Sequence, residues 1–373
     1  MIARVGPAGS NAAVATPAPG QWRRALAEAV SSVGELLTVL DLAEERLPPH
    51  LRPADEAARD FPLRVPRSFV ARMRRGDPAD PLLLQVLPTV AELDAAPGYT
   101  IDPLAEVSGV PGSVPEAAAP LPGVLHKYRG RALLMVTGAC AIHCRYCFRR
   151  HFPYGDHARW GDGWGRALDW LAANPGVDEV ILSGGDPLAA SDDRLGELVA
   201  GLSAIPHLAR LRVHTRLPVV LPERVDDELL AWLGGTRLAP VVVLHANHAQ
   251  ELDDEVTAAV ERLCGAGATV LNQAVLLAGV NDSVEALCDL SRALFGAGVL
   301  PYYLHLLDRV AGAAHFEVSA ARARELARGV MAELPGYLVP RLVREVPGAP
   351  CKVPIDWLGE GDAAGESSLD PAG

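Results

Sequence analysis

The spacing of apolar positions changes near residue 131. From there onward, short runs rich in Val and Leu alternate with amphipathic segments, which is typical of parallel strands joined by helices. The runs lack polar alternation, as expected for strands buried on both faces. The pattern therefore predicts an α/β fold with a parallel sheet, whose strands are expected at 131–137, 178–183, 210–214, 240–245, 269–275 and 300–306.

Helices are expected between these strands, where apolar residues recur at helical spacing. Leu195, Leu198 and Leu202 indicate one such helix. Others are expected over 256–265, where Gly265 is a stop signal, over 283–296, and after Ser319.

The part of the chain before the sheet predicts short helices. Trp22, Leu26 and Val30 are expected on one helix face, and Ser68 is expected to cap a turn. The organisation expected along the chain is a mobile N-terminus (1–20), a helical segment (21–125), the sheet core (126–340), a C-terminal arm (341–359) and a disordered tail (360–373).

Composition excludes several functional classes. The net charge of -12 argues against the broad basic surface that nucleic-acid binding requires. No run approaches the roughly 18 apolar residues needed to cross a bilayer, and residues 1–20 lack the apolar centre of a signal peptide. Six cysteines in 373 residues do not indicate a disulfide scaffold. We therefore expect a cytoplasmic protein without a nucleic-acid or membrane partner.

Three cysteines follow the first expected strand. Cys140, Cys144 and Cys147 are spaced Cys-x3-Cys-x2-Cys. Three thiolates can hold three irons of a [4Fe–4S] cluster and leave the fourth iron open, as a catalytic metal requires. The spacing taken alone also fits a zinc site that lacks one ligand, or chance. In a barrel of βα units, loops after strands form the face that carries chemistry.

Two further motifs carry candidate chemistry. The run Ser-Gly-Gly-Asp-Pro at 183–187 follows the second expected strand, and its glycines allow close approach of a ligand to the backbone. An ordinary connecting loop has the same composition. Lys352 lies among small residues and prolines. It is either a surface lysine or the amine that binds pyridoxal phosphate covalently.

Together these motifs resemble those of radical S-adenosylmethionine enzymes. The chain is similar to lysine 2,3-aminomutases, most closely to the branch that makes β-lysine for modification of elongation factor P. The resemblance covers roughly residues 60 to 357 and includes KYRGRALLMVTGACAIHCRYCFRRHFPYGD, ILSGGDPL, LRVHTRLPVVLPERV, HANHAQEL, LNQAVLLAGVND, PYYLHLLDRVAGAAHF and LPGYLVPRLVREVPGAPCKVP. It implies an open partial TIM barrel, (βα)6, and a radical amino shift that converts L-lysine to β-lysine.

The resemblance also implies cofactor sites. Cys140, Cys144 and Cys147 would ligate a [4Fe–4S] cluster whose open iron binds S-adenosylmethionine, and Lys352 would hold pyridoxal phosphate. Other cofactor contacts are implied for Ser183, Gly184, Gly185, Asp186, His245, Gln273, Lys127 and Arg131. Structural roles or plain surface charges remain open for the last four of these.

Three residues are implied for the substrate. Arg149 matches the arginine that pairs with the substrate carboxylate, which suits a guanidinium fork. Asp308 and Glu345 match two carboxylates that bind the remote ammonium of lysine, and Glu345 replaces the usual Asp. Each can equally be an ordinary loop carboxylate. For Arg145 and Arg150, a surface ion pair at the barrel rim is the simpler interpretation.

The implied partners are L-lysine, a one-electron reductase, elongation factor P and the ligase that attaches β-lysine to it. The zinc site of the free-lysine enzymes is not expected, because no cysteine cluster follows Lys352. Alternatives are a radical aminomutase of another amino acid, supply of free β-lysine, modification of RNA or a peptide without pyridoxal phosphate, and a non-enzymatic iron or zinc protein.

Overall fold

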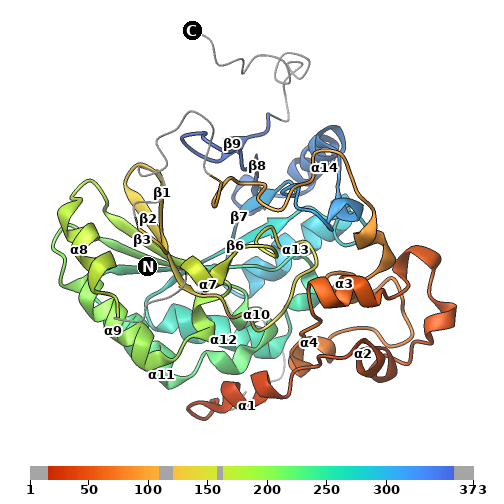
Figure 1. Ribbon diagram of the computed structural model, residues 1–373, viewed down its shortest axis with the longest axis horizontal. Helices are drawn as coiled ribbons and strands as arrows, with labels where there is room; N and C mark the ends of the chain where they lie inside the picture. Colours follow the sequence, from red (N-terminus) through yellow and green to blue (C-terminus); the bar gives the residue numbers. More distant parts are fainter. Residues whose placement is uncertain (1–15, 109–120, 158–162, 357–373) are drawn as a thin grey trace, which may run out of the picture.

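The computed structural model describes residues 16–108, 121–157 and 163–356. It contains a nine-stranded sheet whose strands follow chain order. The strands are β1 (Val124–Tyr128), β2 (Arg131–Thr137), β3 (Glu179–Gly184), β4 (Arg210–Thr215), β5 (Ala239–Leu244), β6 (Thr269–Val275), β7 (Leu300–His305), β8 (Arg341–Arg344) and β9 (Val353–Pro354). Strands β2 to β8 are parallel, whereas β1 and β9 pair antiparallel at the two edges. The sheet is therefore an open crescent (Figure 1).

The six expected strands correspond to β2 through β7, and the open partial-barrel fold class is confirmed. The sheet continues beyond them into β8, a seventh parallel strand within the expected C-terminal arm. Strand β8 holds only two buried residues between two exposed arginines. Its sequence therefore gives no apolar run, and pairing with β7 decides its structure.

Helices pack on the outer face of the sheet, with α8, α9, α11 and α12 along one side in Figure 1. The helices after β2 are α7 (Tyr154–His157), α8 (Gly165–Ala173), α9 (Asp192–Ser203), α10 (Leu217–Val220), α11 (Asp227–Gly234), α12 (Asp254–Gly265), α13 (Val284–Gly296) and α14 (Ala320–Glu333). The expected helices are confirmed as α9, α12, α13 and α14. Ser283 and Ser319 cap the last two, because each hydroxyl accepts a backbone N–H from the first turn.

In the described part of the N-terminal segment the α-helices are short: α1 (Gln21–Ala27), α2 (Val33–Val39), α3 (Asp55–Asp60), α4 (Arg67–Val70) and α5 (Pro81–Leu84). Two expectations for it were wrong. Val30 lies beyond α1 and forms a bridge with Val65. Ser68 lies inside α4 and donates to the carbonyl of Val220 at 2.7 Å, so it joins this segment to α10 instead of capping a turn.

Short 3-10 helices connect the main elements. They are η1 (Glu44–Arg46), η2 (Pro49–Leu51), η3 (Val90–Leu93), η4 (Pro187–Ala189), η5 (Pro222–Arg224), η6 (Ala249–Glu251), η7 (Ala314–Phe316) and η8 (Gly336–Leu338).

A buried ion cluster joins the N-terminal segment to the cysteine loop. Arg145 is 0% exposed and donates to both carboxylate oxygens of Glu92, and to the carbonyls of Phe61 and Ala57. Arg150 lies 2.9 Å from the same carboxylate. The interpretation of Arg145 and Arg150 as surface ion pairs was therefore wrong.

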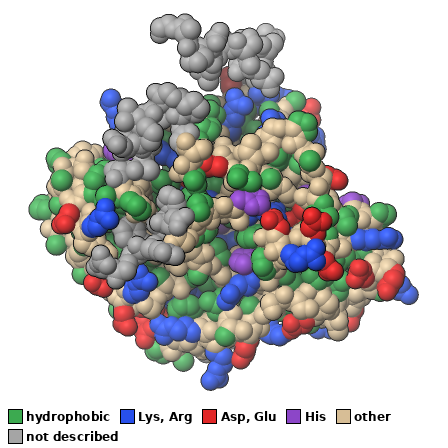
Figure 2. Space-filling model, in the orientation of Figure 1, with side chains coloured by type: hydrophobic (Ala, Val, Ile, Leu, Met, Phe, Trp, Pro, Cys, Tyr) green, Lys and Arg blue, Asp and Glu red, His purple; other side chains and the backbone are tan. Residues whose placement is uncertain are grey.

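Most of the expected mobile N-terminus (1–15) and the whole expected tail lie outside the described residues. Among the residues that the structure describes, no helix is long and apolar enough to span a membrane. On the face shown in Figure 2, basic side chains are scattered among acidic ones.

Candidate active site

A cavity of about 340 Å³ lies where the strands of the crescent end. All residues that the sequence predicted as site residues line it: Cys140, Cys144, Cys147, Ser183, Gly184, Gly185, Asp186, His245, Gln273, Lys127, Arg131, Arg149, Asp308, Glu345 and Lys352. The structure thus brings together residues that are up to 225 positions apart in the chain (127 to 352). Their individual roles remain predictions.

The three cysteines lie on the loop after β2, and each is a free thiol. Burial raises the pKa of Cys140 well above its usual value, and the neighbouring Cys147 raises it further. Burial and then Cys144 raise the pKa of Cys147 to about 11. The thiols of Cys140 and Cys147 therefore keep their protons until a metal displaces them, so metal loading releases protons. A set of three thiols opening into one cavity fits a cluster with one open iron.

The loop after β3 docks on the start of the cysteine loop. Gly185 N donates to Thr137 O at 2.8 Å. A Cβ at Gly185 would lie 2.5 Å from Ala139 O and 2.7 Å from Gly138 O, which is closer than atoms can approach. Gly184 has a φ of +132°, a conformation open to glycine. Glycine is thus required here for close backbone packing, as well as for any ligand.

The carboxylate of Asp186 is already engaged within this loop. It accepts from Thr215 Oγ1 at 2.7 Å and from the backbone N–H groups of Arg216, Leu217 and Leu188. Asp186 therefore ties the β3 loop to the end of β4, and its predicted contact with a cofactor stays a prediction.

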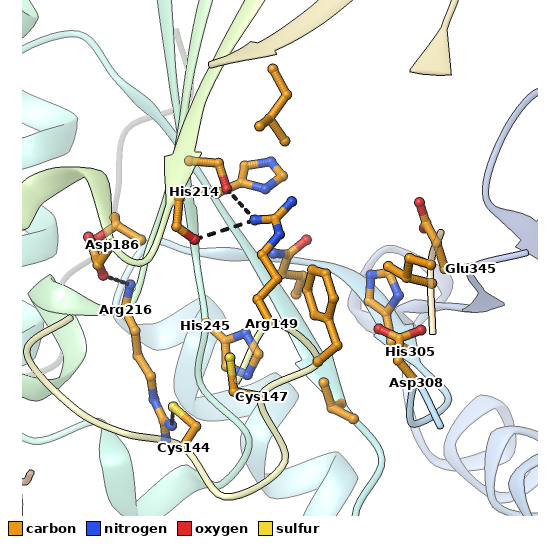
Figure 3. A pocket seen from close by; sticks show the side chains of 18 of the residues that line it. Cys144, Cys147, Arg149, Asp186, His214, Arg216, His245, His305, Asp308 and Glu345 are labelled. Carbon is orange, nitrogen blue, oxygen red and sulfur yellow. Dashed lines mark hydrogen bonds between the residues drawn. The ribbon is translucent and has the colours of Figure 1, made fainter. Parts of the chain in front are cut away.

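The opposite side of the cavity carries the amine of Lys352 and the carboxylates of Glu345 and Asp308. The two carboxylates lie at the right of Figure 3. Lys352 Nζ lies 2.6 Å from Glu345 Oε2, and Tyr128 donates to the other oxygen of Glu345. Burial raises the pKa of Asp308 to about 7, and the negative charge of Glu345 adds to this. Burial also acts on Glu345, but Lys352 and Tyr128 bring its pKa below the usual value.

Arg149 lies between the cysteines and the carboxylate pair (Figure 3). Its Nε and Nη2 contact the two oxygens of Glu106 at 2.7 and 3.0 Å, and Nη1 donates to Ser183 Oγ. Lys127 Nζ lies 3.0 Å from the same Glu106 carboxylate. Burial alone would raise the pKa of Glu106, but Arg149 and Lys127 lower it to about 2. The guanidinium fork is thus occupied by an internal carboxylate.

Lys127 and Lys352 are the only two lysines of the chain, and both line the cavity. The other basic positions are arginines or histidines. A primary side-chain amine is therefore available only inside this site, where Lys352 approaches Glu345 and Lys127 approaches Glu106.

Comparison with known proteins gives the family. The profile of the Radical SAM superfamily matches residues 134–291. L-lysine 2,3-aminomutase of Escherichia coli (strain K12) is 48% identical over 342 residues, which cover 91% of this chain and 96% of that protein. The chain belongs to the L-lysine 2,3-aminomutase family. The proteins of this name from Haemophilus influenzae and Clostridium subterminale are 45% and 33% identical, over 89% and 90% of this chain and 94% and 77% of theirs.

Membership of the Radical SAM superfamily implies a [4Fe–4S] cluster and S-adenosylmethionine. The cavity of this family member also has a buried polar atom that is available to a ligand. His214 Nε2 is buried and has no hydrogen-bond partner among the described residues. Burial, then the charge of Arg212, lowers the pKa of His214 well below its usual value, so its imidazole is neutral.

Several residues of this lysine 2,3-aminomutase family site were missed by the sequence analysis. Glu106, Tyr128, His214, Arg216 and His305 all line the cavity. Glu106 precedes the sheet core and belongs to no motif, so no local signal marks it. His214 and Arg216 fall inside the matched stretch LRVHTRLPVVLPERV, at the end of an expected strand. Their position on the catalytic face of a barrel was the available signal.

Proposed function

We propose that this protein is an L-lysine 2,3-aminomutase that uses a [4Fe–4S] cluster, S-adenosylmethionine and pyridoxal phosphate to convert L-lysine to β-lysine. One arrangement carries the proposal: three free thiols, the amine of Lys352 and the acidic pair Asp308 and Glu345 line the same cavity. The identity with relatives that carry this name supports it.

Each group of residues has a task that follows from its position. The three thiols hold the cluster, and the β3 loop packs against their loop and fixes its course. Lys352 holds pyridoxal phosphate through its amine, and Glu345, 2.6 Å from that amine, positions it. When bound, the cofactors supply the radical and the electron sink for the amino shift. The chain supplies placement and a cavity that excludes water.

The charges in the cavity favour lysine among amino acids. Asp308 and Glu345 place two carboxyl groups on one side of the site. A substrate with a remote ammonium balances their charge, whereas the remote carboxylate of glutamate meets repulsion. Arg149 lies between this pair and the cysteines and presents a guanidinium to the substrate carboxylate, in place of Glu106. We infer that ornithine, with a shorter side chain, binds more weakly than lysine.

The test is turnover by protein reconstituted anaerobically with iron and sulfide, then supplied with both small cofactors, a reductant and L-lysine. The expected product is β-lysine, identified by mass spectrometry after chromatography, with less product from ornithine and none from glutamate. The proposal is abandoned if loaded protein leaves L-lysine unchanged. Faster conversion of another amino acid would favour the alternative aminomutase.

The attachment site of pyridoxal phosphate has its own test, because the chain has two lysines. Borohydride reduction followed by peptide mass mapping should place the label on Lys352. Lys352→Arg should remove the label and the visible absorption of the bound cofactor, and the matched variant Lys127→Arg should retain both. A label on Lys127 would refute the assignment of Lys352.

We further propose that the β-lysine serves to modify elongation factor P through a separate ligase. The resemblance to that branch motivates this use of the product. The expected result is loss of the β-lysyl mass increment from elongation factor P in cells that lack this gene, and its return on addition of β-lysine. An unchanged mass would contradict the proposed use and leave the aminomutase reaction itself standing.

A further inference from the structure

The guanidinium of Arg216 contacts the sulfur of a candidate cluster ligand. Its Nη1 lies 2.8 Å from Cys144 Sγ (Figure 3) and 2.7 Å from the hydroxyl of Tyr146. Arg216 is only 6% exposed. A hydrogen bond from a cation to a sulfur ligand stabilises the state in which that sulfur carries more negative charge. This contact therefore bears on cluster chemistry.

The surroundings hold this guanidinium in one place. Nη2 donates to Gln85 Oε1 at 2.7 Å and to Glu251 Oε2 at 2.9 Å, while the backbone N–H of Arg216 donates to Asp186 at 2.7 Å. Glu251 is fully buried and also accepts the backbone N–H of Asn247. Arg216 is thus fixed by three segments that are far apart in sequence: the N-terminal segment, the β3 loop and the β5 loop.

The charge of Arg216 is balanced on the side away from the sulfur. Glu251 pairs with Nη2, while Nη1 contacts Cys144 and Tyr146 of the cysteine loop. The ring of Phe69 lies 5.3 Å from the guanidinium carbon and limits access of water. In this low-dielectric setting a hydrogen bond to sulfur is stronger than it would be in water.

A buried arginine on the cysteine loop itself behaves differently from Arg216, which follows β4. Arg145 follows Cys144 directly, yet its guanidinium donates to Glu92 and to the carbonyls of Phe61 and Ala57. Its role is therefore to join the loop to the N-terminal segment. The two arginines offer a matched comparison between a buried charge that contacts a sulfur and one whose hydrogen bonds go to oxygen atoms.

We propose that Arg216 is a positioning residue that raises the reduction potential of the cluster by holding its positive charge against Cys144. The proposal rests on the cluster of the proposed function. Reduction adds one electron from an external reductant such as dithionite, and no bond of the protein forms or breaks. The added negative charge spreads onto the ligand sulfurs, so a fixed cation stabilises the reduced cluster more than the oxidised one.

The main test variant is Arg216→Gln combined with Glu251→Gln, which removes both charges of the buried pair together. Parent and variant are loaded with iron and sulfide, and the cluster is titrated with dithionite under electron paramagnetic resonance, without S-adenosylmethionine. The ratio of reduced to oxidised cluster at the parent midpoint should fall about tenfold, which equals a shift of about 59 mV to lower potential. Iron content and thermal unfolding are measured on the same samples.

The control is Arg145→Gln combined with Glu92→Gln, which should change thermal unfolding but keep the parent midpoint. Arg216→Lys provides a second variant. Its ammonium can balance the charge of Glu251, but it lacks the forked guanidinium that contacts Glu251 and Cys144 at the same time. Arg216→Lys should lower the reduction midpoint of the cluster by less than the double variant does. If the double variant binds no iron, the midpoint of Arg216→Lys alone tests the proposal. Iron-loaded Arg216 variants with the parent midpoint would overturn the proposal. A parent that takes up no four-iron cluster would instead overturn the proposed function.

Discussion

At the scale of single residues, the cavity is a set of opposed charges. Glu106 accepts from both Arg149 and Lys127, and Lys352 faces Glu345. Each ligand that we propose carries charge, so binding replaces one of these internal pairs by a pair with the ligand. The affinity for a ligand then depends on the difference in free energy between the internal ion pair and the ion pair with the ligand, both in the same low-dielectric site.

We predict that Asp308 makes lysine binding depend on pH. Its pKa, raised to about 7 by burial and by Glu345, leaves the carboxyl largely protonated at pH 6 and ionised at pH 8. Only the ionised form attracts an ammonium, so affinity for lysine rises with pH. We expect the KM for L-lysine to fall about five- to tenfold from pH 6 to pH 8. In Asp308→Asn, KM should be high at both pH values and this step should be absent. A step that persists in the variant would assign it to another group.

Glu106 occupies the fork that we assign to the substrate carboxylate. Glu106→Gln removes a competing negative charge from Arg149 and Lys127. We expect the KM for L-lysine to fall about threefold to tenfold, a modest change because Gln still bonds to the cations, and the thermal midpoint of unfolding to fall as well. The exposed Glu317→Gln, which loses the ion pair with Arg309, serves as control and should leave KM unchanged. A higher KM in Glu106→Gln would mean that Glu106 orients Arg149 instead of competing for it.

At the scale of elements, the site depends on two loops that touch through their backbones. The loop after β2 carries the cysteines, and the loop after β3 packs on its first residues through Gly185. These backbone contacts can hold one loop against the other without any contact between their side chains. The close packing of the two loops at the start of the cysteine loop therefore requires a residue without a Cβ at position 185.

Gly185→Ala should separate these loops, because the added Cβ has two carbonyl oxygens within 2.7 Å. We expect iron uptake during reconstitution to fall by at least half, as judged by iron and sulfide per chain. Gly176→Ala is the matched control, since a Cβ there meets nothing within 4 Å. Equal iron content in the two variants would show that this contact does not hold the cysteine loop.

At the scale of the whole molecule, the N-terminal segment is part of the catalytic architecture. Glu92 and Gln85 reach the cysteine loop from this segment, through Arg145 and Arg216. One hydrophobic core includes both Trp22 and the strands of the crescent. The segment thus packs against the cysteine loop and holds two of the arginines around it.

Glu92→Ala should be strongly destabilising, because it leaves Arg145 and Arg150 buried without their carboxylate. The expected loss is about 3 to 5 kcal/mol in the free energy of unfolding, measured by denaturant titration. Glu325→Ala, which removes an exposed pair with Arg322, should change that free energy by no more than about 0.5 kcal/mol. Similar values for both variants would exclude a structural role for the Glu92 cluster.

The sequence by itself predicted the parallel crescent and part of the set of residues that line its cavity. Strands β2, β3 and β5 contain apolar runs, and β4, β6 and β7 carry apolar residues between polar ones. The caps at Ser283 and Ser319 are local signals, so the strands and these caps could be predicted without coordinates. The cysteine spacing, the glycine loop and Lys352 could be read for the same reason. Each depends on residue types at short range.

Only the tertiary structure decided which partners these residues meet. The short strand β8 forms because β7 offers it an edge, and Val30 leaves its helix because Val65 pairs with it. Glu106, Arg216 and the Glu92 cluster act through contacts between segments 35 to 131 residues apart. Such contacts leave no periodic trace in the chain, because the free energy that places them comes from burial and charge pairing in the folded molecule.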